Sequence, residues 1–264
     1  GDTYWAIDEE IRMIFQNKSD IKYIFRCLDY NKVFDDKSDY NYDNVPTYLY
    51  DDNPWNDVQY LFNKDIFIDN TLGVVKYTLH GQKMPDMDQY SSWAADHPVG
   101  KDYVLQNYSA PARCEDQKEF TEKEAEIVRH NVEENVLDMV KAHPETTFYF
   151  YTPPYSALWW YKTKCSGNLK RYFQAEQLQA ELLLQYDNVK LFSFTDLFDL
   201  TCDLDNYKDD THYSEQISAN IMNWIHDGTC QMTEANYKSR IENMTDYYLH
   251  YNYSKSGIPL AQEN

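Results

Sequence analysis

The strongest constraint on the fold is an alternation between helical segments and short apolar runs. Residues 3–18 repeat apolar side chains every three or four positions, with acidic residues early and a lysine late, as an amphipathic helix does. After a short turn, the run IKYIFRCLDY at 21–30 is typical of a buried strand. The same order returns later, with helices expected over 121–143, 168–186 and after Ser214, and strands over 146–152 and 188–194.

This repeated order predicts an α/β fold, a three-layer αβα sandwich with a mainly parallel sheet. No internal repeat or low-complexity linker interrupts the chain, so we expect a single domain over residues 1–264. Periodicity breaks up over 31–120, where one short helix is expected around 56–63, and this stretch is predicted to be a loop-rich insertion. An insertion of this length usually builds a lid or a binding wall, and a plain surface excursion is the alternative.

The formal net charge of −20 bears on the partners of the chain. A surface this acidic repels phosphate backbones, so nucleic acid is excluded as a partner. No apolar run approaches the length needed to span a bilayer. The chain starts at Gly1 without a methionine, and we expect an upstream segment, including a membrane anchor, to have been removed.

The five cysteines are odd in number and form no C-x-x-C pair, so neither a disulfide framework nor a zinc site is predicted. The seven histidines are scattered, with none in a metal-binding spacing. Phosphate-binding glycine-rich loops are also missing from the sequence. We therefore expect no metal and no cofactor.

Functional groups of such sheets collect in the loops past the carboxyl ends of the strands. Asp29 and Asn31 follow the segment IKYIF (21–25) of the first predicted strand, Tyr155 and Ser156 follow the second strand, and residues 209–212 follow the third. Asp209 and His212 are spaced so that the carboxylate can orient the imidazole and stabilise its protonated form, as a general base requires. The alternative is a simple helix start, because Asp210 and Ser214 are ordinary capping residues.

The sequence Asp209-Asp210-Thr211-His212, before what is expected to be the closing helix, resembles the last motif of the SGNH (GDSL-type) hydrolase superfamily. Members of this superfamily have a flavodoxin-like fold. Stretches such as LDYNKVFDD and FYFYTPPYSALWW further resemble a subgroup from Gram-positive bacteria that sits behind an N-terminal membrane anchor. The resemblance implies an extracytoplasmic serine esterase or acyltransferase that acts on a cell-surface polysaccharide or another acylated substrate.

Two departures from the family pattern concern the reaction itself. The family serine lies in a G-D-S-like motif after the first strand, and this chain contains neither that motif nor G-x-S-x-G. We therefore expect the first strand and the nucleophile to be missing. Gly1 either matches the glycine of the next motif or is a remnant of cloning. The G-x-N motif falls on Cys27-Leu28-Asp29, where an ionised Asp29 would accept hydrogen bonds and oppose an oxyanion. A protonated Asp29, or Asn31 in its place, could serve as the donor.

Other candidates have plain structural alternatives. Ser156 could bind substrate or act as a turn hydroxyl. Tyr155, Trp159 and Trp160 could form an aromatic platform for a sugar ring or pack against the insertion. Arg26 could neutralise Asp29 in a structural ion pair.

Three functions follow from these observations. The leading one is an ester hydrolase or acyltransferase in which His212 takes the proton of an upstream serine and Asp209 holds the imidazole. The second is a catalytically degenerate fold retained for carbohydrate binding or scaffolding. A cytosolic phosphate or phosphodiester enzyme is the third, and it has no metal-ligand cluster or phosphate loop to support it.

Overall fold

The computed structural model describes residues 3–17, 20–35, 47–50, 53–82 and 97–261. The chain divides into two compact units, one made of residues 1–37 and 98–264 and the other of residues 38–97. Each unit is described separately. The interpretation as a single domain over 1–264 with an insertion at 31–120 stays a prediction.

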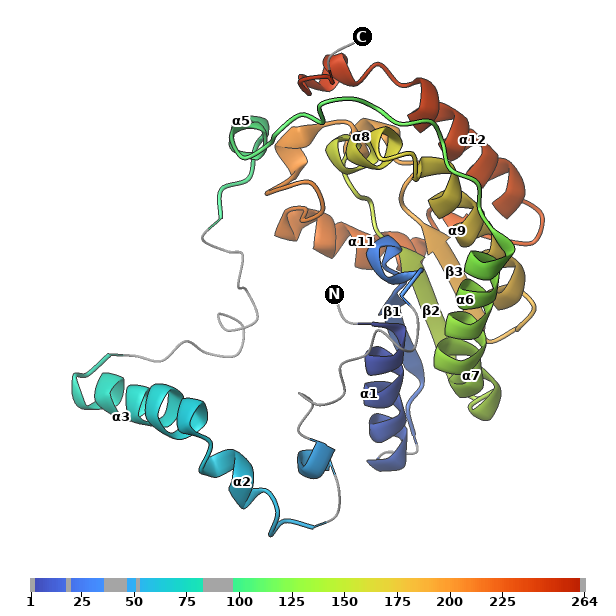
Figure 1. Ribbon diagram of the computed structural model, residues 1–264. Coiled ribbons are helices and arrows are strands. Elements are labelled where there is room, and N and C mark those ends of the chain that lie inside the picture. Colours follow the sequence, from blue (N-terminus) through green and yellow to red (C-terminus); the bar gives the residue numbers. More distant parts are fainter. Residues whose placement is uncertain (1–2, 18–19, 36–46, 51–52, 83–96, 262–264) are drawn as a thin grey trace. The chain divides into compact units, whose positions relative to one another are not determined.

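Four strands of the first unit form one sheet in the order β1-β2-β3-β4 (Figure 1). β1 (Tyr23–Cys27), β2 (Thr147–Thr152) and β3 (Val189–Ser193) run parallel, and β4 (Gln231–Met232) pairs antiparallel with β3. The predicted α/β class with a mainly parallel sheet is confirmed. The three parallel strands all fall within the apolar runs of the sequence, because each is rich in the β-branched and aromatic residues that pack well on a pleated surface.

The predicted helices of the first unit are present. Thr121 and Glu124 form the expected capping box, in which each side chain accepts the backbone N–H of the other residue. The helix that follows is interrupted by one π-helical stretch, Glu133–Leu137. The helices are α1 (Tyr4–Asn17), α5 (Lys101–Gln106), α6 (Glu122–Val132), α7 (Asp138–Ala142), α8 (Ala157–Cys165), α9 (Leu169–Leu183), α10 (Phe198–Thr201), α11 (Glu215–Asp227) and α12 (Tyr237–His250).

Three of these helices correct the sequence analysis. α5 lies in a stretch expected to be mostly loop, and α8 was not predicted. α8 is buried on nearly every side, so its sequence lacks the polar face that would reveal a helical period. α12 follows α11, which is therefore not the closing helix.

Buried side chains lie on both faces of the sheet. Side chains alternate along a strand, so Phe148 and Phe150 of β2 point away from Tyr149 and Tyr151. Tyr149 and Tyr151 pack against a small cluster that α11 completes, made of Phe192, Phe194, Ile217, Ile221 and Ile225. The opposite face carries the larger cluster, whose members include Val128 and Val132 of α6, Trp160 of α8, Phe173 of α9 and Tyr248 of α12.

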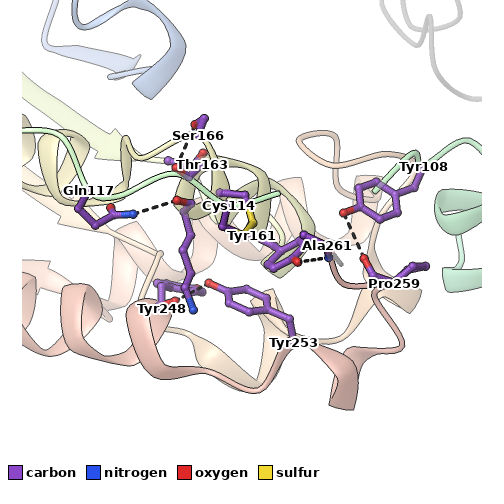
Figure 2. The surroundings of a disulfide bond; sticks show 12 residues. Tyr108, Cys114, Gln117, Tyr161, Thr163, Ser166, Tyr248, Tyr253, Pro259 and Ala261 are labelled. Atoms are coloured by element: carbon purple, nitrogen blue, oxygen red, sulfur yellow. Dashed lines mark hydrogen bonds between the residues drawn. A yellow bond between two sulfur atoms is a disulfide. The ribbon is translucent and has the colours of Figure 1, made fainter. Parts of the chain in front are cut away.

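A disulfide joins Cys114 to Cys165 (Figure 2), although the sequence analysis predicted no disulfide framework. It ties the segment before α6 to the end of α8, across 51 residues of sequence. Hydrogen bonds run beside it from Glu115 N to the Cys165 carbonyl at 2.8 Å, and from Gln117 Nε2 to the Lys164 carbonyl at 2.9 Å. Closing a loop of this length stabilises a fold by about 4 kcal/mol in the chain-entropy picture.

Gly167 allows the segment 114–118 to pass close to the end of α8. It adopts a left-handed conformation with φ of +72°, and a Cβ atom there would overlap the carbonyl oxygen of Asp116. The N–H of Lys118 donates to the Gly167 carbonyl at 2.7 Å. The segment 114–118 is therefore held against the turn between α8 and α9 by backbone contacts as well as by the covalent bond.

The second unit is mostly helical over its described residues. It contains a 3₁₀ turn (Thr47–Tyr50), α2 (Val58–Leu61), a π-helical stretch (Asp65–Thr71) and α3 (Leu72–Leu79). α2 lies within the helix expected around 56–63, whereas the helix over 65–79 was not predicted. Apolar residues fall on every side of that helix, so its sequence shows no amphipathic stripe.

Candidate functional site

Asp209 and His212 form a hydrogen-bonded pair in the turn that leads into α11. Asp209 Oδ2 lies 2.6 Å from His212 Nδ1, and Asp209 Oδ1 accepts the backbone N–H groups of Thr211 at 2.8 Å and His212 at 2.7 Å. The aspartate thus holds both the ring and the backbone of the histidine. Both side chains are half exposed, 48% for Asp209 and 50% for His212. A base in this position is oriented by the protein and open to a reacting group.

The electrostatics of Asp209 favour its ionised form. Partial burial raises the pKa of this carboxyl, but the hydrogen bonds from the backbone and ring of His212 and from the backbone of Thr211 outweigh it, and the pKa is lowered overall. The carboxylate is therefore charged at neutral pH. It can stabilise an imidazolium that forms during a reaction.

Residues at the start of α8 also hold the turn that contains Asp209 and His212. Ser156 Oγ donates to the Asp210 carbonyl at 2.8 Å, and the Lys162 ammonium pairs with Asp210 Oδ2 at 2.7 Å. Ser156 also caps α8 by accepting the N–H of Trp159 at 3.4 Å, and its side chain is fully buried. The predicted role of Ser156 in substrate binding is wrong, because a buried hydroxyl with these partners cannot reach a ligand. Its role is to fix the turn that carries the pair.

Asp29 lies in the loop after β1 and acts as a hydrogen-bond acceptor. Its Oδ1 accepts the N–H of Asn31 at 2.8 Å and the hydroxyl of Tyr155 at 2.8 Å. Asn31 Nδ2 in turn donates to the Tyr155 hydroxyl at 3.5 Å. Asp29 is thus the cap of a 3₁₀ turn, Tyr30–Lys32. It is not arranged as an oxyanion donor.

Arg26 does not neutralise Asp29. Its guanidinium donates to the carbonyl groups of Asn135 and Tyr4, at 2.6 and 2.9 Å. Within the described ranges, Asp29 has no ion-pair partner. The ion-pair interpretation of these two residues is therefore wrong.

Side chains from all three loops influence one another at this end of the sheet. Burial raises the pKa of Tyr213, and the nearby Cys27 and Asp29 raise it further. Burial and then the charge of Asp29 raise the pKa of Cys27 to about 12. The Cys27 thiol is thus protonated at neutral pH and is not a nucleophile. Tyr213, just before α11, thus lies near enough to the loop after β1 to be influenced electrostatically by Cys27 and Asp29.

The aromatic platform proposed for Tyr155, Trp159 and Trp160 is wrong, because all three rings are buried. Trp160 stacks on Phe173 and Tyr248, with ring centroids 4.5 and 4.8 Å apart. These rings fill the core around α8. The three side chains are therefore packing residues. The sequence analysis gave packing against the insertion as the alternative, whereas these rings pack within the first unit.

The sequence analysis missed a buried polar cluster around Glu176 of α9. Glu176 accepts hydrogen bonds from Tyr30 at 2.7 Å, Thr152 at 3.0 Å and Ser193 at 2.9 Å, so it joins the loop after β1 to the ends of β2 and β3. A signal was present in the sequence. Glu176 stands three positions after Phe173 and four before Ala180, on the apolar face of the predicted helix 168–186.

Gly1, which was expected to match a family glycine, lies outside the described residues. Among the residues that the structure does describe, no group of three or more His, Cys, Asp or Glu side chains is placed to hold a metal ion. No helix in the same ranges is long and apolar enough to cross a membrane. No family model, curated protein or solved structure matches the chain.

Proposed function

We propose that this chain has an SGNH-like fold and supplies the acid–base half of a serine ester hydrolase or acyltransferase that acts on an acylated cell-surface glycan. The observation that carries the proposal is the 2.6 Å contact between Asp209 Oδ2 and His212 Nδ1, in a half-exposed pair before α11. A structural ion pair needs neither the backbone clamp on Asp209 nor the open position of the ring. A general base needs a ring that is held in place and can reach the proton it takes, and this pair provides both.

The proposed reaction begins with a serine hydroxyl from a segment outside this chain. The hydroxyl attacks the ester carbonyl while His212 Nε2 takes its proton, because Nδ1 is engaged with Asp209. The imidazolium, stabilised by the Asp209 carboxylate, then protonates the leaving alkoxide, and an acyl-serine remains. Water, or a hydroxyl of an acceptor glycan, attacks this ester in a second round of the same steps. The outcome is hydrolysis in the first case and acyl transfer in the second.

The free edge of β1 is where we place the strand that carries this serine. Among the described strands, β1 pairs with β2 alone (Figure 1). The side chains of Tyr23 and Phe25 on β1 are 59% and 46% exposed. Parallel sheets are normally covered on both faces, and an exposed apolar edge is a template for another strand. A strand paired in parallel here would end beside Cys27 and Asp29. With α11 on one face and the larger cluster on the other, the architecture would be the three-layer αβα sandwich.

An extracytoplasmic location at a bacterial cell surface, behind an upstream membrane anchor, belongs to the same proposal. The disulfide between Cys114 and Cys165 supports it, because disulfides persist in oxidising compartments and are rare in the cytosol.

The test is hydrolysis of 4-nitrophenyl acetate by a form of the protein extended at its N-terminus. We expect hydrolysis, and a loss of about 10²- to 10⁴-fold in His212→Ala. His226→Ala is the matched control, because His226 lies 2.8 Å from Asp227 in an exposed pair at the far end of α11. Equal rates in the His212 and His226 variants would contradict the proposal.

A degenerate module that binds a glycan without catalysis is the second candidate. Asp29 favours it, because the residue at the expected oxyanion-donor position accepts hydrogen bonds from Asn31 and Tyr155. Binding to a glycan array that is unchanged in Asp209→Ala and His212→Ala, in a protein without esterase activity, would select this candidate.

A further inference from the structure

The Asp209–His212 pair lies within a short hairpin, residues 206–214. Two backbone hydrogen bonds close this hairpin, from the Lys208 N–H to the His212 carbonyl at 2.8 Å and from the Ser214 N–H to the Asn206 carbonyl at 2.9 Å. An antiparallel bridge between Tyr207 and Tyr213 lies between these two bonds. The pair therefore keeps a fixed place only if the hairpin is itself held by the rest of the fold.

Tyr207 fixes one end of the hairpin. Its side chain is fully buried, and its hydroxyl donates to the Pro154 carbonyl at 2.6 Å. Its own carbonyl accepts the Gly100 N–H at 2.9 Å. Burial raises the pKa of Tyr207 well above its usual value, so the hydroxyl keeps its proton and donates at neutral pH. The hydroxyl thus joins the hairpin to the segment that follows β2.

The segment that receives this bond, residues 153–156, is buried and has little conformational freedom. It begins with two consecutive prolines, which fix φ and provide no N–H. Tyr155 of this segment donates to Asp29 in the loop after β1, and Ser156 donates to the Asp210 carbonyl in the hairpin. A bond to this segment therefore places the hairpin relative to the ends of β1 and β2.

We propose that Tyr207 is a positioning residue for His212, because its bond to Pro154 holds the hairpin that carries the imidazole. Its role in a reaction rests on the proposed function. Ser156 attaches the hairpin at Asp210, and a single attachment would leave the hairpin free to rotate about it. The Tyr207 hydroxyl supplies a second attachment, which removes that rotation. A reacting group that is misplaced by about 1 Å can lose about 10²-fold in rate, so a small movement of the hairpin matters.

Tyr207→Phe removes the hydroxyl and keeps the ring. Tyr253→Phe is the matched control, because Tyr253 is also buried, at 2% exposure, and its hydroxyl donates to the Tyr248 carbonyl at 2.5 Å. Each variant loses one buried hydrogen bond from a phenol to a backbone carbonyl. In urea denaturation, we therefore expect the equilibrium constants of unfolding of the two variants to agree within about threefold.

The first readout is the hydrogen exchange of the amides that close the hairpin, those of Lys208 and Ser214. We expect these amides to exchange about tenfold faster in Tyr207→Phe and to change by less than about twofold in Tyr253→Phe. Equal acceleration in the two variants would overturn the inference, because a general loss of stability affects both. Unchanged exchange in Tyr207→Phe would also overturn it.

The wild type provides a second measurement if Tyr207→Phe does not fold. The Ser156 N–H donates to the Asp210 carbonyl at 3.3 Å and reports on the segment that holds the hairpin. Its protection against exchange should follow that of Lys208 and Ser214 within about threefold as urea is added, because segments that are tied together open together. A hairpin that opens at lower urea than this segment would overturn the inference.

The second readout is hydrolysis of 4-nitrophenyl acetate by the extended protein. Tyr207→Phe should lower kcat about tenfold and leave KM within about twofold, because a displaced base weakens the transition state more than substrate binding. Tyr253→Phe should change neither. Hydrolysis that depends on His212 but not on Tyr207 would overturn this inference alone. Hydrolysis that ignores His212 would remove the catalytic proposal, and the exchange rates would still decide whether Tyr207 holds the hairpin.

Discussion

Glu176 and Asp209 lie in two contrasting regions of the first unit, although both are carboxyl groups that accept several hydrogen bonds. Glu176 receives three, from the hydroxyls of Tyr30, Thr152 and Ser193, in a fully buried cluster at the ends of the strands. Burial raises its pKa, and the three donors do not cancel that effect. Asp209 is half exposed, and there the donors outweigh burial, so its pKa is lowered.

The difference teaches that water access decides what each carboxyl can do. The buried one is driven toward its neutral form, in which it can link three segments without the cost of an isolated charge. The half-exposed one keeps its charge beside an imidazole and is available to stabilise a cation. We therefore assign Glu176 to the stability of the fold and Asp209 to chemistry.

Removing the buried carboxyl should give the largest effect. Glu176→Ala leaves three hydroxyls without their acceptor and opens a cavity at the junction of β2, β3 and the loop after β1. We expect a loss of about 3–5 kcal/mol in the free energy of unfolding, measured by urea denaturation. Glu126→Ala, on the exposed face of α6, is the control and should stay within about 0.5 kcal/mol of the wild type. A similar value for both variants would contradict the assignment of Glu176.

Ser156 joins the start of α8 to the turn that carries the exposed pair, so its loss should affect both α8 and the pair. Ser156→Ala removes the cap of α8 and the hydrogen bond to the Asp210 carbonyl, at an expected cost of about 1–2 kcal/mol. The turn that holds His212 should also move, which the ring resonances of His212 in an NMR spectrum would report. Ser218→Ala, at an exposed position on α11, should change neither quantity. Unshifted His212 resonances in the Ser156 variant would show that α8 does not hold the turn.

The opposite pKa shifts give a prediction about pH. Because the pKa of Glu176 is raised in the folded protein, its contribution to stability is fully present below the unfolded value of 4.5 and is lost as pH rises through the higher folded value. In Glu176→Gln, the side chain at position 176 does not titrate. Its free energy of unfolding relative to the wild type should therefore increase with pH above the unfolded value, by up to about 1.4 kcal/mol per unit. A constant difference between the two proteins at every pH above the unfolded value of 4.5 would contradict the raised pKa.

The contrast also explains what the sequence could predict. The contact between Asp209 and His212 could be predicted because the two residues lie three positions apart in one turn. β1, β2 and β3 could be predicted because each is a local run of apolar residues, which is visible without knowledge of distant contacts. Glu176, the Asp29–Tyr155 hydrogen bond and the Cys114–Cys165 bond join segments far apart in the chain. The local sequence pattern around each of these residues does not indicate which distant residue it contacts. α8 was missed for a related reason, since burial on all sides removes the period by which a surface helix is recognised.

Asp209→Asn should have the smallest effect on stability and a large one on chemistry. The carboxylate contributes stability above its unfolded pKa of 3.8, and this contribution is lost as pH falls through the lower folded value. Because the pair is half exposed, we expect a change below about 1 kcal/mol at neutral pH. Hydrolysis of 4-nitrophenyl acetate by the extended protein should nevertheless fall by about 10²- to 10⁴-fold, because the amide cannot stabilise the imidazolium.

Asp227→Asn removes the carboxylate from an exposed aspartate–histidine pair at the C-terminal end of α11 and should match Asp209→Asn in stability while leaving hydrolysis intact. If Asp209→Asn instead unfolded the protein as Glu176→Ala is expected to do, Asp209 would be a structural carboxyl as well. Water access would then not separate the two roles. If neither aspartate variant lost hydrolysis, the exposed pair before α11 would be a second surface ion pair, and the base would have to be sought elsewhere in the fold.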